Sequence, residues 1–205
     1  MARRGDDLRD HILGVAKELF LEMGFERASM DEVANRARTS KRSVYSHFES
    51  KEKLFLAVIE RVRKLFLDRL QVPSAYSEKP EEALTFFCAR YLEVILYEPS
   101  VQMMRITLAE TGRYPEAAAQ HFEVMFGVVQ ARLGAYLKAS FDLSTRASNE
   151  AAQRLIAQLL YPLLPRALFG IEQLVTEFGE RAPSPKVDIK RIRAAVAELL
   201  AAIGK

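Results

Sequence analysis

Apolar residues recur along almost the whole chain at the 3.6-residue period of an α-helix. Between Ile12 and Met23 they fall every three or four positions, and no stretch of strand length alternates between apolar and polar residues. Gly24 follows this segment and predicts a left-handed helix end, with Phe25 folding back onto the helix. The pattern therefore predicts an all-α protein whose first helix spans about residues 7–23.

Three serines mark the expected starts of the next helices. Ser29 opens a Ser-x-x-Glu capping box, in which each side chain can bind a free backbone amide at the start of the helix. Ser40 precedes a short helix of about residues 41–47, and Ser50 opens a long helix of about residues 50–70. We therefore expect one long helix, then two short helices, then a second long helix.

The remainder of the chain also follows the helical period, after a turn-rich joint at residues 71–79. The expected segments are 80–97, 99–112, 115–140, 148–175 and 189–203, with Asp188 as the cap of the last one. Pro162 and Pro165 should kink or break the fourth of these segments, because proline cannot continue the backbone hydrogen bonds of a helix. The sequence predicts a small N-terminal helical domain at 1–53 and a larger helical domain at 54–205, connected by the helix at about 50–70.

The positive charge of the chain is concentrated in one short segment. The whole chain has a formal charge of +3, whereas residues 36–53 hold six basic and two acidic residues, a net +4. Everything outside this segment is thus close to neutral. A basic patch of this kind favours a nucleic-acid partner.

Other features of the sequence narrow the class of protein. The single cysteine, Cys88, lies among apolar residues and suits core packing, and the N-terminus shows no signal sequence, so we expect a cytoplasmic protein. His11 and His121 have no metal-ligand spacing around them. No nucleophile–base pair or glycine-rich phosphate loop is evident, so we expect no enzyme activity, cofactor or metal. A helical scaffold protein is the alternative, and it would lack salt-dependent affinity for DNA.

The two short helices have the layout of a helix-turn-helix. Lys41, Arg42 and Ser43 lie at the start of the second short helix, where side chains reach base edges and phosphates in a major groove. Tyr45 and His47 lie further along the same helix and can meet phosphate. Alternatives stay open for these residues: a solvated basic face, packing of the tyrosine on the first helix, and a capping role for the histidine.

The sequence around these helices resembles the tetracycline-repressor (TetR) family of regulators. The resemblance rests on Phe-Leu-Glu-Met-Gly-Phe at 20–25, Ser-Met-Asp-Glu-Val-Ala at 29–34 and Thr-Ser-Lys-Arg-Ser-Val-Tyr-Ser-His-Phe-Glu-Ser-Lys-Glu-Lys-Leu at 39–54. It covers about residues 8–70, and beyond them only the helical architecture matches. Two positions depart from the family pattern: Arg38 replaces a turn glycine, which adopts positive φ without strain, and Arg42 replaces a small residue.

The resemblance implies a set of DNA-contacting residues. These are Ser29, Thr39, Ser40, Lys41, Arg42, Ser43, Tyr45, His47 and Lys51. It also implies a homodimer on a palindromic operator, because two recognition helices multiply the specificity of one. The expected function is a repressor that a largely apolar small molecule releases from DNA.

The resemblance further implies an effector pocket and a dimer interface in the helical domain. The pocket would be formed by Phe86, Phe87, Tyr91, Met103, Met104, Phe122, Met125 and Phe126. The interface would be formed by Leu155, Ile156, Leu159, Leu160, Ile192, Val196, Leu199 and Leu200. Burial in the core of the single chain is the alternative for both groups, since helical spacing alone does not separate a core residue from an interface residue.

Overall fold

The described part of the protein is built from α-helices, as the sequence predicts. The computed structural model describes the backbone of residues 2–179 and 183–204, and side chains from residue 5 onward. Within these ranges the one β-type pairing is an isolated bridge between Tyr97 and Val175. The chain forms two compact units, residues 1–65 with 102–121 and residues 66–101 with 122–205, which we call the first and the second unit.

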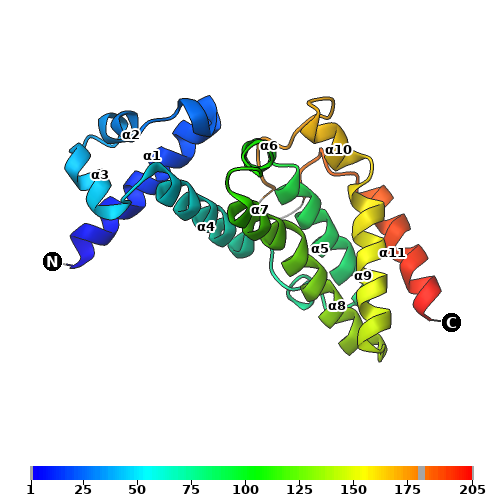
Figure 1. Cartoon of the computed structure of the whole chain (residues 1–205). Coiled ribbons are helices and arrows are strands. Elements are labelled where there is room, and N and C mark those ends of the chain that lie inside the picture. The colour runs from blue at the N-terminus through cyan, green and yellow to red at the C-terminus, as the bar shows by residue number, and fades with distance from the viewer. Residues whose placement is uncertain (1, 180–182, 205) are drawn as a thin grey trace. The chain divides into compact units, whose positions relative to one another are not determined.

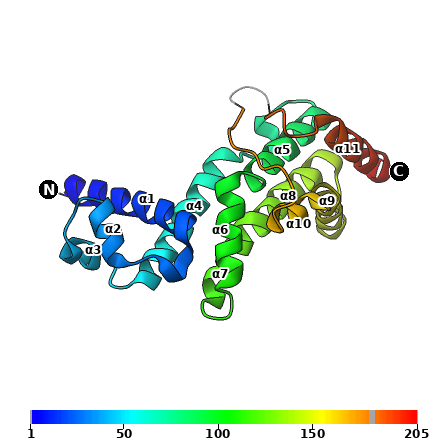
Figure 2. The same ribbon diagram turned by 90° about the horizontal axis from the view of Figure 1, so that it is seen from above.

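The first unit contains the helix-turn-helix. Its helices are α1 (Ala2–Arg27), α2 (Met30–Arg36), α3 (Lys41–His47), most of α4 (Lys51–Arg69), the end of α6 (Glu98–Ala109) and α7 (Pro115–Phe122). Figure 2 shows α2 and α3 beside α1. The bounds of α3 and α4 agree with the expected ones to within a residue at each end. Helix α1 continues past its expected end at residue 23, with a break at Gly24, which has the expected positive φ of 76°.

An aromatic cluster forms the centre of the first unit. The Phe55 ring lies 5.3 Å from that of Phe20 and 4.9 Å from that of Phe25, between ring centroids, and Tyr114 lies 5.1 Å from Phe25. Met103 of α6 is buried in the same core. Residues far along the chain therefore complete the core around the helix-turn-helix, which the sequence pattern does not indicate.

The second unit is a helical bundle. Its elements are the 3₁₀ turn η1 (Pro73–Ala75), α5 (Pro80–Ile95), the π-helical segment η2 (Glu123–Gly127), α8 (Val128–Phe141), α9 (Thr145–Leu160), α10 (Leu163–Leu168) and α11 (Ile189–Ile203). Helix α9 packs against α8 and α11, and α11 also packs against α5 (Figure 1). Asp188 caps α11 as expected, by accepting hydrogen bonds from the amides of Lys190 and Arg191.

The segment after α10 differs from the prediction. The apolar pattern predicts helix to about residue 175, but α10 ends at Leu168 and Gly170 has a φ of 76°. Val175 then pairs with the backbone beside Tyr97, where its carbonyl accepts from the Glu98 amide at 2.8 Å. The prolines break the helix as expected, and the positive φ at Gly170 keeps it from resuming.

A buried carboxylate holds the connector between α10 and α11. Glu93 on α5 is fully buried and accepts hydrogen bonds from the amides of Gly179 at 2.7 Å and Ser184 at 2.9 Å. Arg90 forms an ion pair with the same carboxylate and donates to the Gly179 carbonyl. This charge-compensated site fixes an otherwise irregular segment.

None of the described helices combines the length and apolarity needed to cross a membrane.

Candidate DNA-binding site

Serine side chains set the starts of the helices that form the site. The Ser29 hydroxyl accepts from the amide of Glu32 at 3.1 Å, and that of Ser40 accepts from the amide of Ser43 at 3.1 Å. The Ser50 hydroxyl accepts from the Lys53 amide at 3.2 Å. The three expected caps are therefore confirmed, and each binds a backbone amide that the helix itself leaves free.

The turn between α2 and α3 is a Schellman motif with arginine in the left-handed position. The amide of Thr39 donates to the carbonyl of Ala34 at 3.0 Å, and the amide of Arg38 donates to that of Asn35 at 3.1 Å. Arg38 has a φ of 50°. A left-handed conformation costs a residue with a Cβ about 1 kcal/mol, so the concern raised by the missing glycine is confirmed: the turn forms, with strain.

Two apolar side chains fix the orientation of α3. Val44 is fully buried and Phe48, just after the helix, is 3% exposed. The guanidinium of Arg9 on α1 lies 5.1 Å from the Phe48 ring centroid, a cation–π contact. Because these anchors occupy one side of a seven-residue helix, the residues between them point away from the core.

The outward side of α3 carries the residues that the sequence predicts for DNA contact. Lys41 and Arg42 are exposed, and Tyr45 is 47% exposed, which is unusual for a large aromatic side chain. Thr39, Ser43 and His47 are half-buried around them. The exposure of Tyr45 argues against packing on the first helix, and its phenol is free to reach a hydrogen-bond acceptor or donor.

Some basic residues of the cluster form ion pairs within the protein and others do not. Arg36 binds Glu22 at 2.5 Å and Glu32 at 3.1 Å, and these hydrogen bonds raise the pKa of its guanidinium. Lys41 lies 2.5 Å from Asp31, with both groups exposed. Arg42 makes no ion pair with any residue that the structure describes. A guanidinium without an internal partner is the best-placed group in the cluster for phosphate or guanine.

Lys51, which the resemblance implies as a DNA contact, is bound within the fold. Its ammonium donates to the backbone carbonyls of Phe25 at 3.0 Å, Glu26 at 3.2 Å and Ala28 at 3.1 Å, and it lies 4.4 Å from the Phe25 ring centroid. An ammonium has three N–H donors, and here all three bind the end of α1. The structure therefore shows Lys51 as a cap that joins α4 to α1, and a contact with DNA would require it to leave these carbonyls.

Contacts from the turn just before α7 also support the site, and no sequence signal points to them. The phenol of Tyr114 donates to the Glu52 carboxylate at 3.1 Å, and the guanidinium of Arg113 lies 2.5 Å from Glu26. Both partners belong to the segments that frame the helix-turn-helix. These residues are distant along the chain, so only the fold brings them together.

The residues predicted for an effector pocket fall into three environments. Phe87, Tyr91 and Met125 are buried in the second unit, where the Tyr91 hydroxyl donates to the Met125 carbonyl at 3.1 Å. Phe86 and Phe126 are half-buried in that unit, whereas Phe122 is 62% exposed and lies 5.0 Å from the Phe126 ring. Met103 and Met104 are buried side chains of the first unit. The second unit thus holds six residues of this set and the first unit holds two, and a shared pocket stays a prediction.

A buried histidine lies in the first unit beside the end of α7. His121 is 4% exposed, and burial lowers the pKa of its imidazole from 6.5 to about 4. Its Nδ1 lies 2.9 Å from the Thr107 hydroxyl, which donates its single hydrogen to the Met103 carbonyl. The hydroxyl must therefore accept from Nδ1, and the neutral ring leaves Nε2 as a bare acceptor that no described residue pairs with.

Most residues proposed for a dimer interface lie inside the single chain. Leu155, Ile156, Leu159, Ile192, Val196 and Leu199 are at most 9% exposed, and only Leu160 and Leu200 are half-buried. They fill the space where α9 and α11 pack within the chain. Of the two alternatives that helical spacing leaves open, core burial holds for these six, so an interface on these helices must use their other faces.

Two family models match the chain. The model for bacterial regulatory proteins of the tetR family matches residues 12–58, which contain the helix-turn-helix. The model for the C-terminal domain of AefR-like transcriptional repressors matches residues 82–202, more than half of the chain.

Among the described residues, no group of three or more His, Cys, Asp or Glu side chains could hold a metal ion.

Some relatives are similar to this chain over a short segment, and others are similar over most of its length. The activator FasR of Mycolicibacterium smegmatis is 46% identical over 56 residues, 27% of this chain and 26% of that protein. The first curated relatives are thus matched over only a quarter to a third of their length. The regulator UidR of Escherichia coli is 27% identical over 172 residues, 80% of this chain and 83% of that protein.

Solved structures share the fold over nearly the whole chain. A TetR-family transcriptional regulator from Mesorhizobium loti has a TM-score of 0.80 at 24% identity, covering 97% of this chain and 98% of its own. The flavonoid-responsive regulator FrrA has a TM-score of 0.73 at 28% identity, covering 96% and 97%. The helix-turn-helix geometry, both family models and these structures agree, and the chain belongs to the tetR family of DNA-binding transcriptional regulators.

Proposed function

We propose that the protein is a repressor that binds a palindromic operator as a homodimer and that a small molecule releases it from DNA. The observation that carries the proposal is the outward side of α3, a helix fixed by buried anchors. It presents a 47%-exposed Tyr45 and Arg42, which has no ion-pair partner among the described residues. The similarity of residues 82–202 to repressor C-terminal domains favours repression over activation.

A dimer would use the exposed faces of α9 and α11. On α9, Ala157 is exposed and Leu160 is half-buried, and on α11 the alanines at 194, 197 and 201 are exposed. The alanines are small, which suits the close packing of helices from two copies. Two copies would place two α3 helices on half-sites about one or more DNA turns apart, which explains why a helix of seven residues can specify an operator.

Release by an effector requires that the second unit act on α4. Helix α4 begins in the first unit and ends in the second, where the Leu70 carbonyl just after it accepts a hydrogen bond from Arg132 of α8. The guanidinium of Arg69 also lies 3.8 Å from the Phe178 ring centroid. A ligand that binds more tightly when these contacts shift would favour a dimer that no longer fits adjacent grooves.

The effector should be largely apolar and aromatic. The middle helices bury aliphatic side chains together with Phe87, Tyr91 and three methionines, and the structural neighbour FrrA is a flavonoid-responsive regulator. Apolar walls with few polar groups are usual in small-molecule sites. A flavonoid is therefore the first probe, chosen for its chemistry.

The experiment starts with an operator selected from short genomic duplexes. Fluorescence anisotropy then compares the whole site with a site in which one half is scrambled, with and without a flavonoid panel. The proposal expects a large loss of affinity for the half-site and release of the whole site by at least one aromatic compound. Equal affinity for both duplexes would rule out the dimeric mode.

A further inference from the structure

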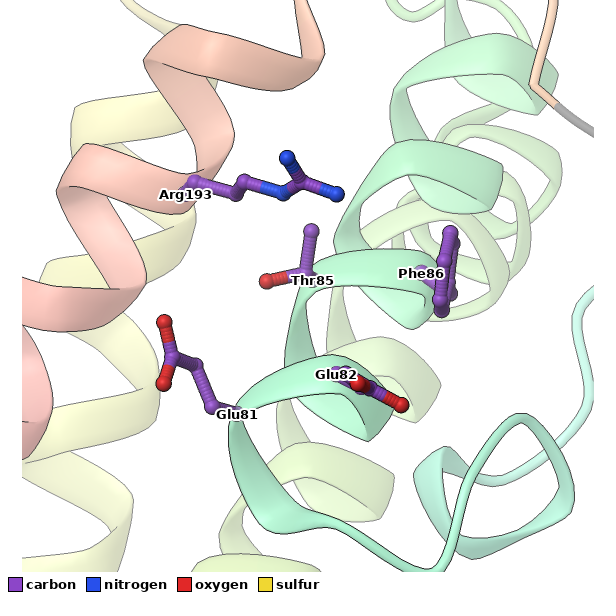
Figure 3. A pocket seen from close by; sticks show the side chains of 5 residues that line it. All are labelled: Glu81, Glu82, Thr85, Phe86 and Arg193. Atoms are coloured by element: carbon purple, nitrogen blue, oxygen red, sulfur yellow. The ribbon is translucent and has the colours of Figure 1, made fainter.

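A groove on the second unit lies between α5 and α11 and has unpaired polar groups on its walls. It has a volume of about 270 Å³ and is lined by Glu81, Glu82, Thr85, Phe86 and Arg193 (Figure 3). Four of these residues occupy the first turns of α5, and the arginine comes from α11. The volume is close to the lower end of the range for ligand sites, about 300 Å³, so only a small molecule would fit.

The most informative of these groups is a buried hydroxyl. Thr85 is 2% exposed, and its Oγ1 has no hydrogen-bond partner among the described residues. Buried side-chain polar atoms are nearly always paired, since an unpaired one keeps the full cost of its lost hydration. Figure 3 shows the side chain between those of Glu81 and Arg193. A ligand in the groove could supply the missing hydrogen bond.

Two opposite charges on the groove also lack partners. Arg193 and Glu81 are both exposed, and neither takes part in an ion pair or hydrogen bond within the described part of the chain. Glu82, by contrast, accepts from the Lys79 ammonium at 3.2 Å and the Ser77 hydroxyl at 3.0 Å, which lower the pKa of its carboxyl group. The Arg193 charge also lowers the pKa of Glu82 without forming an ion pair with it. The groove thus offers one cation and one anion that have no ion-pair partner among the described residues, with the hydroxyl between them.

Phe86 supplies an apolar wall. Its ring is half-buried and lines the same groove as Thr85, although the two side chains leave α5 in different directions (Figure 3). The two glutamates at the start of α5 would repel a simple anion, and Arg193 would repel a simple cation. The complementary molecule therefore has both charges, separated by a short distance, and an apolar part.

We propose that this groove binds a small zwitterion with an apolar side chain, of the class of the apolar α-amino acids. The ligand carboxylate binds Arg193 and accepts the Thr85 hydrogen, and its ammonium binds Glu81. The apolar side chain lies against Phe86. A guanidinium can bind a carboxylate through two parallel hydrogen bonds, which fixes the orientation of the ligand. This inference concerns a site separate from α3 and does not depend on the proposed operator or effector.

The test is isothermal titration of the full chain, without DNA, with L-leucine and L-phenylalanine. The corresponding amides lack the carboxylate and the N-acetyl derivatives lack the ammonium, so they serve as ligand controls. The inference expects a Kd of about 1 mM or tighter for at least one free amino acid. Binding of the amide or the N-acetyl form should be at least about tenfold weaker, because each loses a charge-assisted contact.

Three variants locate the binding. Arg193→Gln and Thr85→Val should each weaken binding about tenfold or more, while Lys190→Gln, an exposed change on the same helix, should leave it unchanged. Thermal melts verify that the variants fold. No heat for either amino acid at about 10 mM, tenfold above that Kd, would overturn the inference, and so would equal affinity of wild type and Arg193→Gln. DNA binding is measured separately, so its failure would not be confused with failure of this site.

Discussion

Arg42 on α3 and Lys51 at the start of α4 belong to the same basic segment, but only Lys51 is bound to the rest of the fold. Arg42 extends from the fold without an ion pair in the described chain, whereas Lys51 donates to three backbone carbonyls at the end of α1. Arg36 resembles Lys51, since Glu22 and Glu32 bind it. The fold therefore divides one cluster of charge into residues that stabilise the domain and residues that remain available to DNA.

Mutations can test this division, because the two groups of residues should affect different measured quantities. Inward-facing groups should change the free energy of unfolding and leave operator affinity intact in the folded protein. Outward-facing groups should do the opposite. Each prediction below tests one side of the comparison.

The largest effect is expected from the inward-facing His121. Burial lowers the pKa of its imidazole from 6.5 to about 4, so the unfolded chain binds the proton more readily between these pH values. The neutral ring therefore contributes fully to the free energy of unfolding above pH 6.5. This contribution is lost as the pH falls towards 4, by up to about 3 kcal/mol.

Urea unfolding at pH 7 and at pH 4.5 measures this loss. His121→Gln, which does not titrate, should lose less stability than wild type over the same pH interval. His11→Gln, at an exposed position, is the control and should behave like wild type. Identical pH dependence of wild type and His121→Gln would contradict the assignment of a neutral buried ring.

Replacing the Lys51 ammonium should destabilise the first unit. Lys51→Met keeps the aliphatic chain but leaves three carbonyls without their donor, and we expect a loss of about 2 kcal/mol in the free energy of unfolding. Operator affinity, measured where the variant is fully folded, should stay within about twofold, or 0.4 kcal/mol, of wild type. A variant of unchanged stability with much weaker DNA binding would place Lys51 among the outward-facing residues instead.

The phenol of Tyr45 tests the outward side. Tyr45→Phe removes one hydroxyl from an exposed ring, so stability should change by less than about 0.5 kcal/mol. If the hydroxyl binds the DNA backbone, affinity for the operator should fall about fivefold per half-site, the value of one hydrogen bond of about 1 kcal/mol. Anisotropy titrations and urea melts of the same preparation give both quantities, and an affinity equal to wild type would remove Tyr45 from the contact surface.

The smallest expected effect concerns the turn. Arg38→Gly relieves a left-handed residue at φ 50° and should stabilise the domain by at most about 0.5 kcal/mol, the strain relieved less the extra chain entropy of glycine. Arg38→Ala keeps the Cβ and serves as the matched control, which should show no such gain. A glycine variant less stable than the alanine variant would mean that the turn is not strained.

The sequence predicts what short-range interactions decide. Ser29, Ser40 and Asp188 cap their helices as expected, because a cap needs only the next three residues along the chain. The left-handed turn at Arg38, by contrast, is expected from the family resemblance, in which a glycine occupies this position. The bounds of α3 and its outward polar side follow from these local signals together with the burial of Val44.

Long-range packing decides what the sequence leaves open. Lys51 meets the end of α1 only after the helices fold together, and Met103 joins the core of the first unit from far along the chain. The apolar stripes of α9, through Leu155, and of α11, through Ile192, have the same spacing whether they pack within their own chain or against a second copy. Periodicity reports which face of a helix is apolar, and it does not report which surface covers that face.

The most direct test of the DNA-binding side of α3 is selection from a pool of short genomic duplexes, followed by sequencing of the bound fraction. Wild type, Arg42→Ala and Tyr45→Ala are run in parallel, with folding verified by circular dichroism. The account predicts that wild type enriches a palindrome and that both variants lose or weaken this enrichment. The same enrichment in all three proteins, or none in wild type together with salt-dependent binding that the variants share, would contradict it.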